Sequence, residues 1–229
     1  MTYVMAGIHG MYDAYRKLLD MVEFSDEDTL FVLGDVADLG PSPCRVLQDM
    51  SCRSNVFPIL GDHDFMAAMM LKQLLDDPDL AEDDTEDDAS TPAGWLKAGG
   101  QTTYDEFLTL TEDLQEGILE YIDEFSLYEI VTVGEQKFIL VHGGLGNYDP
   151  AKKMAEYSLR ELLYGPTDYD RLYYKKSVLV TAHVPTFRID EASRGKVYHG
   201  ARQLAIDCGA GCGEKLGCVC LDSGEEFYA

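Results

Sequence analysis

The segment 31–40 constrains the fold of this chain more than any other stretch. Its apolar run 31–33 (Phe-Val-Leu) stops at Gly34 and Asp35, and Asp38 follows three residues later. A short apolar run bounded by glycine is typical of a strand that is covered on both faces of its sheet. Glycine lets the backbone turn sharply, so we expect Asp35 to point into a crevice at the carboxyl end of this strand. Taken alone, Asp35 could equally cap the following turn, and Asp38 could be a solvated loop charge.

Four further apolar runs end in the same way, in a residue that can bind a metal ion or transfer a proton. The run 3–6 leads to His9, 56–60 to Asp62 and His63, 137–141 to His142, and 177–181 to His183. In an open α/β sheet, ligands bind in the crevice outside the carboxyl ends of the strands. A single histidine at a strand end is more often a structural residue, but four of the five histidines occupy this position. We therefore expect these side chains to converge on one site, with only His199 outside the pattern.

The segments between these runs predict helices and further strands. The spacing of apolar residues predicts helices over 11–22, 43–50, 65–75 and 95–125. The first helix would join the strands 3–6 and 31–33 as parallel neighbours. A hairpin is expected over 127–141, and closing strands over 203–206 and 216–221. The expected buried positions of the last helical segment are Phe107, Leu108, Leu110, Leu114, Ile118, Leu119, Ile122 and Phe125.

Length and charge bound the class of protein. At 229 residues the chain could form one large α/β domain or two small ones, and no linker divides it. The formal net charge of -24 disfavours nucleic acid and membrane surfaces as partners, because neutralising phosphates requires clusters of Lys and Arg. The chain shows no basic leader or long apolar segment, so we expect a cytoplasmic location. The segment 76–88 is rich in carboxylates and lacks Lys and Arg, which predicts a solvated loop.

The motifs at the strand ends resemble those of the calcineurin-like metallophosphoesterases. The resemblance is strongest to the bacterial branch of the phosphoprotein serine/threonine phosphatases, which also holds the dinucleoside tetraphosphatases. It covers the whole chain and implies an α/β fold, an αββα sandwich of two mixed sheets flanked by helices. It also implies a single domain over 1–229, with an acidic and helical insertion at about 76–125. The similar segments are 7–10 (Gly-Ile-His-Gly), 34–38 (Gly-Asp-Val-Ala-Asp), 61–64 (Gly-Asp-His-Asp), 96–100, 142–145 (His-Gly-Gly-Leu), His183 and 206–209.

The resemblance also implies a role for each candidate residue. Asp35 would bridge two metal ions, and His9 would bind the first of them. The second ion would be held by Asp62, His142 and His183. A metal-bound hydroxide would attack phosphorus in line, His63 would protonate the leaving oxygen, and Asp38 would orient the imidazole of His63. Imidazole and carboxylate ligands suit manganese, iron or zinc.

The chain departs from the family pattern at four positions. Gly7 stands where the family has an aspartate ligand, so the first metal site is expected to be weak. Asp62 replaces an asparagine and adds a negative charge at the second site. Leu39 and Pro166 stand where the family has two arginines that hold the substrate phosphate, and neither can donate a bidentate hydrogen bond. Arg160 or Arg171 would have to reach the site from elsewhere.

Two functional hypotheses follow from these features. The first is a metal-dependent phosphoesterase with an altered metal centre, acting on a phosphoprotein or a small phosphate ester. It is favoured by the retained pair of His63 and Asp38. The second is a catalytically impaired pseudophosphatase that serves as a binding or regulatory module. It is favoured by the loss of the carboxylate at position 7 and of both arginines, since metal charge and phosphate contacts stabilise the transition state of phosphoryl transfer.

Overall fold

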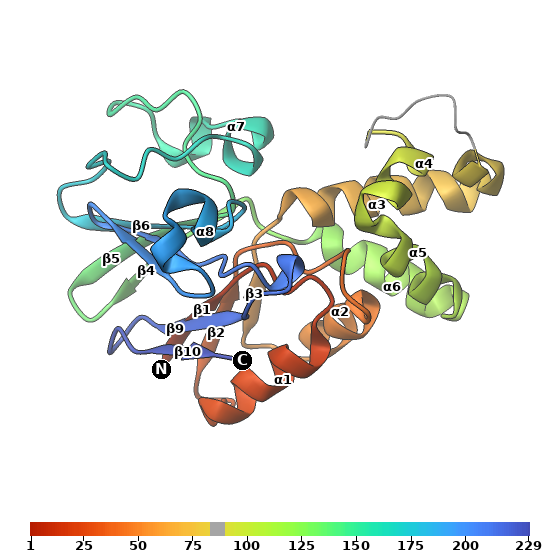
Figure 1. The fold of residues 1–229 in the computed structure, drawn as a ribbon, viewed down its shortest axis with the longest axis horizontal. Helices are drawn as coiled ribbons and strands as arrows, with labels where there is room; N and C mark the ends of the chain where they lie inside the picture. Colours follow the sequence, from red (N-terminus) through yellow and green to blue (C-terminus); the bar gives the residue numbers. More distant parts are fainter. Residues whose placement is uncertain (83–89) are drawn as a thin grey trace.

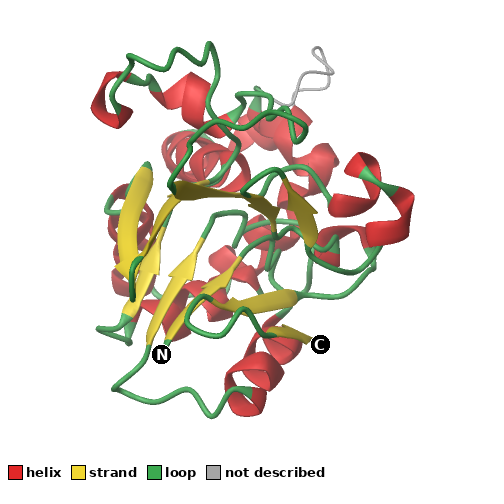
Figure 2. Cartoon of the chain, turned by 90° about the vertical axis from the view of Figure 1, so that its left-hand side faces the viewer, coloured by secondary structure: helices red, strands yellow, loops and turns green. Residues whose placement is uncertain are grey.

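Two five-stranded β-sheets form the centre of the molecule in the computed structural model, which describes residues 1–82 and 90–229 (Figures 1 and 2). The first sheet has the order β10-β9-β1-β2-β3 and the second β4-β5-β6-β8-β7. The strands of the first sheet are β1 (Thr2–Met5), β2 (Thr29–Val32), β3 (Val56–Pro58), β9 (Gly217–Cys220) and β10 (Glu226–Tyr228). Those of the second are β4 (Tyr128–Val133), β5 (Gln136–Val141), β6 (Ser177–Thr181), β7 (Tyr198–Gly200) and β8 (Gln203–Ala205).

Both sheets are mixed, as predicted. In the first sheet β1, β2 and β3 are parallel, while β9 runs antiparallel to β1 and β10. In the second sheet β5, β6 and β8 are parallel, and β4 and β7 are antiparallel at the edges. The expected parallel pairing of the first two strands and the expected hairpin of β4 and β5 are confirmed. The parallel strands direct their carboxyl ends to one side of each sheet.

Apolar side chains fill both faces of the inner strands. Val4, Phe31, Leu140 and Val180 belong to the cluster packed between the two sheets. Residues next to them in sequence, such as Met5, point to the opposite face of the first sheet and pack against helices. Because successive residues of a strand point to opposite faces, burial on both sides requires a continuous apolar run. This packing explains why the strand sequences do not alternate between apolar and polar residues.

Helices cover the outer face of the first sheet. They are α1 (Tyr12–Met21), α2 (Pro43–Ser51), α3 (Asp62–Asp76), α4 (Pro92–Trp95), α5 (Gln101–Leu108) and α6 (Glu112–Asp123). The helices and this face of the sheet share one apolar cluster. Its buried helical residues include Leu18 of α1, Leu47 of α2, Leu71 of α3, Phe107 of α5 and Ile118 of α6. A smaller cluster that contains Leu162 of α7 (Leu159–Leu163) covers the other face of the second sheet. The predicted αββα arrangement is therefore confirmed.

The remaining helical elements are short. One is α8 (Thr186–Ile189), and another is a π-helical turn at Leu96–Gly100. The 3-10 helices are Pro78–Glu82, Met154–Glu156, Glu191–Ser193 and Ala210–Cys212. In the part of the chain that the structure describes, no helix has the length and apolar character needed to cross a membrane.

The segment 95–125 was predicted as one helical stretch, and this prediction was wrong because the structure contains separate helices there. The π-helical turn, in which Gly99 has φ +125°, and a second break after α5 divide this segment into separate helices. Each short helix has its own buried face, so Leu108 and Leu114 are exposed, whereas Ile118 and Ile122 are buried as expected. The predicted acidic loop 76–88 contains the 3-10 helix at its start, and its residues 83–88 lie outside the described part of the chain. The proposed insertion at about 76–125 stays a prediction.

The helix α3 begins three residues earlier than predicted. Gly61 precedes it in an extended conformation, and the Asp64 side chain accepts a hydrogen bond from the Gly61 amide at 3.1 Å. Asp62 and Asp64 thus occupy the first turn of α3, where carboxylates interact favourably with the positive end of the helix dipole. Asp62 and His63 therefore project from a helix terminus and not from a loop.

Candidate metal centre

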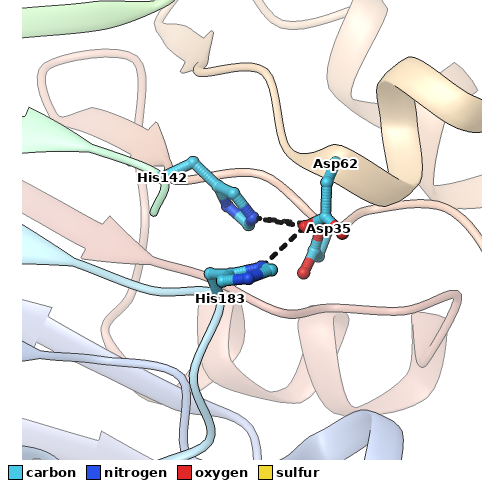
Figure 3. Close-up of side chains that lie close together, drawn as sticks. All are labelled: Asp35, Asp62, His142 and His183. Carbon is cyan, nitrogen blue, oxygen red and sulfur yellow. Dashed lines mark hydrogen bonds and ion pairs between the residues drawn. The ribbon is translucent and has the colours of Figure 1, made fainter. Parts of the chain in front are cut away.

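Seven predicted site residues lie together at the carboxyl ends of the strands. A pocket of about 320 Å³ is lined by residues that include His9, Asp35, Asp62, His63 and His183. Ligand atoms of Asp35, Asp62, His142 and His183 lie within 4.8 Å of one another, and so do those of His9, Asp35 and His63. Asp35 belongs to both groups. In Figure 3, His142 at the end of β5 and His183 after β6 point at the carboxylates of Asp35 and Asp62. His199 lies elsewhere, paired with Glu226 at 2.6 Å.

The backbone that places Asp35 is crowded and strained. Gly34 has φ +78°, and a Cβ atom there would lie 2.5 Å from the Gly61 Cα and 2.6 Å from the His142 Nδ1. Only glycine fits this position, as the sequence predicted for the turn after β2. Asp35 has φ +56°, and His9, Asp38 and His183 also have positive φ. Non-glycine residues in this region are uncommon and gather at functional sites.

The first ligand group forms around Asp62. Its Oδ1 lies 2.9 Å from His142 Nε2 and 2.7 Å from His183 Nδ1. Burial alone would raise the pKa of Asp62, but the hydrogen bonds from the two histidines outweigh it and hold the pKa well below its usual range. Burial alone would lower the pKa of His142, but the Asp35 carboxylate and the hydrogen bond to Asp62 raise it to about 10. In the absence of an ion, a proton on the His142 imidazole compensates part of the carboxylate charge.

The second ligand group contains His9, which is 6 % exposed. Its Nε2 lies 3.8 Å from Asp35 Oδ2, and its Nδ1 lies 3.1 Å from the Ala37 carbonyl oxygen. The His63 ring packs against it edge to face, with ring centroids 4.9 Å apart. Burial and the neighbouring His63 lower the pKa of His9. A neutral imidazole with one nitrogen fixed by a carbonyl is the form that binds a metal ion.

His63 and Asp38 form a hydrogen bond of 2.8 Å between Nδ1 and Oδ2. Asp38 is 1 % exposed and also accepts hydrogen bonds from Trp95 Nε1 at 2.9 Å and Thr103 Oγ1 at 2.7 Å. Burial alone would lower the pKa of His63, but the bond to Asp38 and the nearby Asp35 raise it to about 9. The imidazole is therefore oriented and protonated at neutral pH. Trp95 and Thr103 were not predicted, because their link to Asp38 spans more than 50 residues of sequence.

Asp64 is a supporting residue that sequence reasoning missed. It is fully buried, and its carboxylate accepts hydrogen bonds from the amides of Asp35, Val36, Ala37 and Gly61. Burial and the Asp35 charge raise its pKa to about 6. These bonds fix the loop after β2 to the start of α3, so Asp64 positions Asp35 without facing the pocket. The sequence did offer a signal for Asp64, because it lies two residues after Asp62 in the same Gly-Asp-His-Asp segment.

Asp207 and Arg188 also line the pocket, and neither was assigned a role from the sequence. Asp207 follows β8 as Asp35 follows β2, so the same strand-end pattern could have identified it. Burial raises its pKa, against the opposing charge of His9. Arg188 lies on α8, five residues after His183. Arg160, by contrast, lines a separate cavity with Pro166, and Arg171 lies 5.7 Å from the rings of Tyr148 and Tyr173.

The residues present fit divalent metal ions. Nitrogen and carboxylate oxygen donors converge from several strands, and His9 and His142 each direct Nδ1 to a backbone carbonyl, which leaves Nε2 for an ion. Such a donor set at the strand ends of a double-sheet α/β fold defines a candidate metal-dependent hydrolytic site.

The comparisons with known proteins place the chain in a family. The model of the calcineurin-like phosphoesterases matches residues 2–210, and the chain belongs to this family, which is metal-dependent. Over 100 residues, the chain is 26 % identical to the symmetrical bis(5'-nucleosyl)-tetraphosphatase of Wigglesworthia glossinidia brevipalpis. The matched segment covers 42 % of this chain and 37 % of that protein. The chain is 39 % identical over 64 residues to the enzyme of the same name from Delftia acidovorans, 27 % of this chain and 23 % of that protein. These matches thus span well under half the length of the curated relatives.

Solved structures share the fold. A protein described as a putative diadenosine tetraphosphatase aligns over all of this chain and 92 % of its own, with a TM-score of 0.68 and 15 % identity. A protein serine/threonine phosphatase from Saccharomyces cerevisiae aligns over all of this chain and 79 % of its own, with a TM-score of 0.63 and 14 % identity. At these identities the likeness supports the fold alone.

Proposed function

We propose that this chain hydrolyses phosphoric esters at the strand ends that carry the two ligand groups. The observation that carries the proposal is the sharing of Asp35 between both groups, next to the hydrogen-bonded His63 and Asp38 in the same pocket. When bound, divalent ions would activate water for attack on phosphorus and stabilise charge on the phosphoryl oxygens. Manganese, iron and zinc all suit the donors.

The two groups assign the metal ligands, except for His63, which is assigned as the proton donor. Asp35 and His9 would hold the first ion. Asp35, Asp62, His142 and His183 would hold the second. The carbonyl oxygens of Ala37 and Leu33 fix the ring orientation of His9 and His142, so little reorganisation is needed when ions bind.

His63 is the residue that would protonate the leaving oxygen. Its Nδ1–H donates to Asp38, so Nε2–H is the group free to donate toward a substrate. The raised pKa of about 9 keeps this proton in place at neutral pH. Asp38 would position the ring and stabilise its charge, and Trp95 and Thr103 keep Asp38 in place.

Arg188 would contact the substrate phosphate. Leu39 lines the pocket but cannot donate hydrogen bonds, and Pro166 lines another cavity. Arg188 lines the pocket from α8, and no carboxylate in the described part of the chain forms an ion pair with it. A guanidinium that is not already paired can bind two phosphate oxygens. This supplies the contact that the sequence motifs lack, and it favours the enzyme over the binding module.

The substrate that we propose is a small phosphate ester. The names of the curated relatives, bis(5'-nucleosyl)-tetraphosphatases, describe enzymes that act on small molecules. The pocket of about 320 Å³ has room for a phosphate group and part of its leaving group. A phosphoprotein remains the other substrate class to be assayed, with a phosphoserine peptide beside the small esters.

The proposal is tested by comparing two esters. The parent protein, His63→Ala and the control His199→Ala are assayed with Mn²⁺ on 4-nitrophenyl phosphate and on glycerol phosphate. An alkoxide needs a proton to leave and nitrophenolate does not, so His63→Ala should lower kcat on the alkyl ester by roughly 10²- to 10⁴-fold and much less on the aryl ester. His199 is exposed on β7, so its variant should match the parent.

Two results would contradict this assignment. Equal losses on both esters would remove His63 from the role of proton donor. A protein that binds Mn²⁺ but hydrolyses none of the esters or the peptide would instead support the binding or regulatory module.

A further inference from the structure

The first metal site has few ligands if only the sequence motifs are counted. Gly7 has no side chain, so His9 and the shared Asp35 are the ligands that remain. The structure places another carboxylate beside position 7. A Cβ atom on Gly7 would lie 2.9 Å from Asp207 Oδ1 and 3.3 Å from its Cγ. The space that a side chain at position 7 would enter is occupied by the Asp207 carboxylate.

Asp207 is a buried carboxylate with few partners. It is 3 % exposed, yet it lines the pocket together with His9 and Asp35. Its Oδ1 accepts a hydrogen bond from the Gly209 amide at 2.9 Å. Its Oδ2 has no hydrogen-bond partner among the residues that the structure describes. A buried charge is costly unless it is paired or coordinates a metal ion, so this oxygen is suited to a cation in the pocket.

The loop after Asp207 is fixed against His9. A Cβ atom on Gly211 would lie 2.5 Å from His9 Cδ2, so the backbone approaches the imidazole as closely as glycine permits. The amide of Thr186 also donates to the Asp207 carbonyl oxygen at 2.9 Å, which ties this residue to the start of α8. Asp207 is therefore held in place from both sides and does not depend on a mobile segment.

We propose that Asp207 is a ligand of the first metal ion and takes the place of the side chain that Gly7 lacks. The proposal rests on the metal centre of the proposed function. Asp207 is outside the cluster of His9, Asp35 and His63 atoms that lie within 4.8 Å of one another, so its carboxylate would turn toward His9 when an ion binds. The first site would then have His9, Asp35 and Asp207, one imidazole and two carboxylates. It would not be the weak remnant expected from the sequence.

The test is metal binding, measured without turnover. The metal-free parent, Asp207→Ala, Asp207→Asn and the control Asp170→Asn are titrated with Mn²⁺ by calorimetry, and bound metal is counted by elemental analysis. Asp170 is exposed and its side chain has no partner among the described residues, so the control makes the same chemical change away from the site. Circular dichroism confirms folding, and the Asn variant can keep the hydrogen bond from Gly209.

The parent and the control should bind two ions per chain. Both Asp207 variants should keep one ion and lose affinity for the other by at least about ten-fold, since a lost metal ligand costs no less than a lost outer-shell partner. Two ions bound with parental affinity in the Asp207 variants would overturn the proposal while the metal centre stands. A parent that binds no metal would overturn the metal centre itself.

A swap of the carboxylate makes the assignment sharper. Gly7 has φ +60°, so Gly7→Asp alone would be strained and would face Asp207 at close range. Gly7→Asp/Asp207→Ala removes that repulsion and should recover the second bound ion that Asp207→Ala lacks. The φ of position 7 is unchanged in the double variant, so circular dichroism and denaturant unfolding first compare its fold with that of Asp207→Ala. A folded double variant that binds no more metal than Asp207→Ala would show that positions 7 and 207 do not serve the same ion.

Discussion

At the scale of single residues, Asp38 determines what His63 can do. Its Oδ2 lies 2.8 Å from His63 Nδ1 and accepts a second hydrogen bond from Trp95, while Oδ1 accepts one from Thr103. Three donors hold this carboxylate, which is 1 % exposed, in a fixed position. The charge keeps His63 protonated, because burial alone would lower the pKa of the imidazole.

The first prediction concerns the pH dependence of hydrolysis. His63 acts in its protonated form, so kcat should fall as pH rises through its pKa of about 9. Asp38→Asn removes the negative charge that raises this pKa, so the alkaline limb of kcat on an alkyl ester should move to lower pH. The limb for the exposed control Asp170→Asn should not move. If the alkaline limb lay at the same pH in Asp38→Asn and in the parent, Asp38 would not be the residue that keeps His63 protonated.

At the scale of elements, the break between α4 and α5 shapes the pocket. The π-helical turn Leu96–Gly100 turns the chain so that Trp95 reaches Asp38, and the Gly99 carbonyl oxygen accepts a hydrogen bond from the Leu39 amide at 3.0 Å. A Cβ atom on Gly100 would lie 2.1 Å from Trp95 Cε2. The absence of a side chain at this position lets the indole pack against the backbone.

The second prediction compares two glycines that face different surroundings. Gly100→Ala should displace Trp95, lower the free energy of unfolding by about 1–3 kcal/mol and reduce hydrolysis of the alkyl ester. Gly117 lies in α6 with no atom within 4 Å of an added Cβ, so Gly117→Ala should raise stability by roughly 0.5–1 kcal/mol with unchanged kcat. Denaturant unfolding and steady-state kinetics measure both effects. A Gly100→Ala protein with parental stability and kcat would contradict the account of the kink.

At the scale of the whole molecule, the sequence predicted the sheets better than the helices. Strands buried on both faces have short apolar runs with sharp ends, so the strand-end positions of Asp35 and His142 could be predicted. The breaks around α5 depend on contacts such as Gly100 with Trp95, which no local pattern contains. Asp207 followed the strand-end pattern, but its meaning depends on its distance from Gly7, two hundred residues earlier in the chain.

The central claim is that one carboxylate joins two metal sites. Asp35 is 3 % exposed, its Oδ1 lies 3.4 Å from His142 Nε2, and its Oδ2 lies 3.8 Å from His9 Nε2. Asp35→Asn preserves the size of the side chain and an oxygen that can accept the hydrogen bond from the His63 amide. It removes the charge that both ions would share.

The most direct measurement is a calorimetric Mn²⁺ titration of the metal-free parent and Asp35→Asn, with Asp170→Asn as the control. We predict two ions per chain in the parent and the control, and a loss of affinity at both sites in Asp35→Asn, because the change removes a charged ligand from each ion. An Asp35→Asn protein that binds two ions as tightly as the parent would contradict the account.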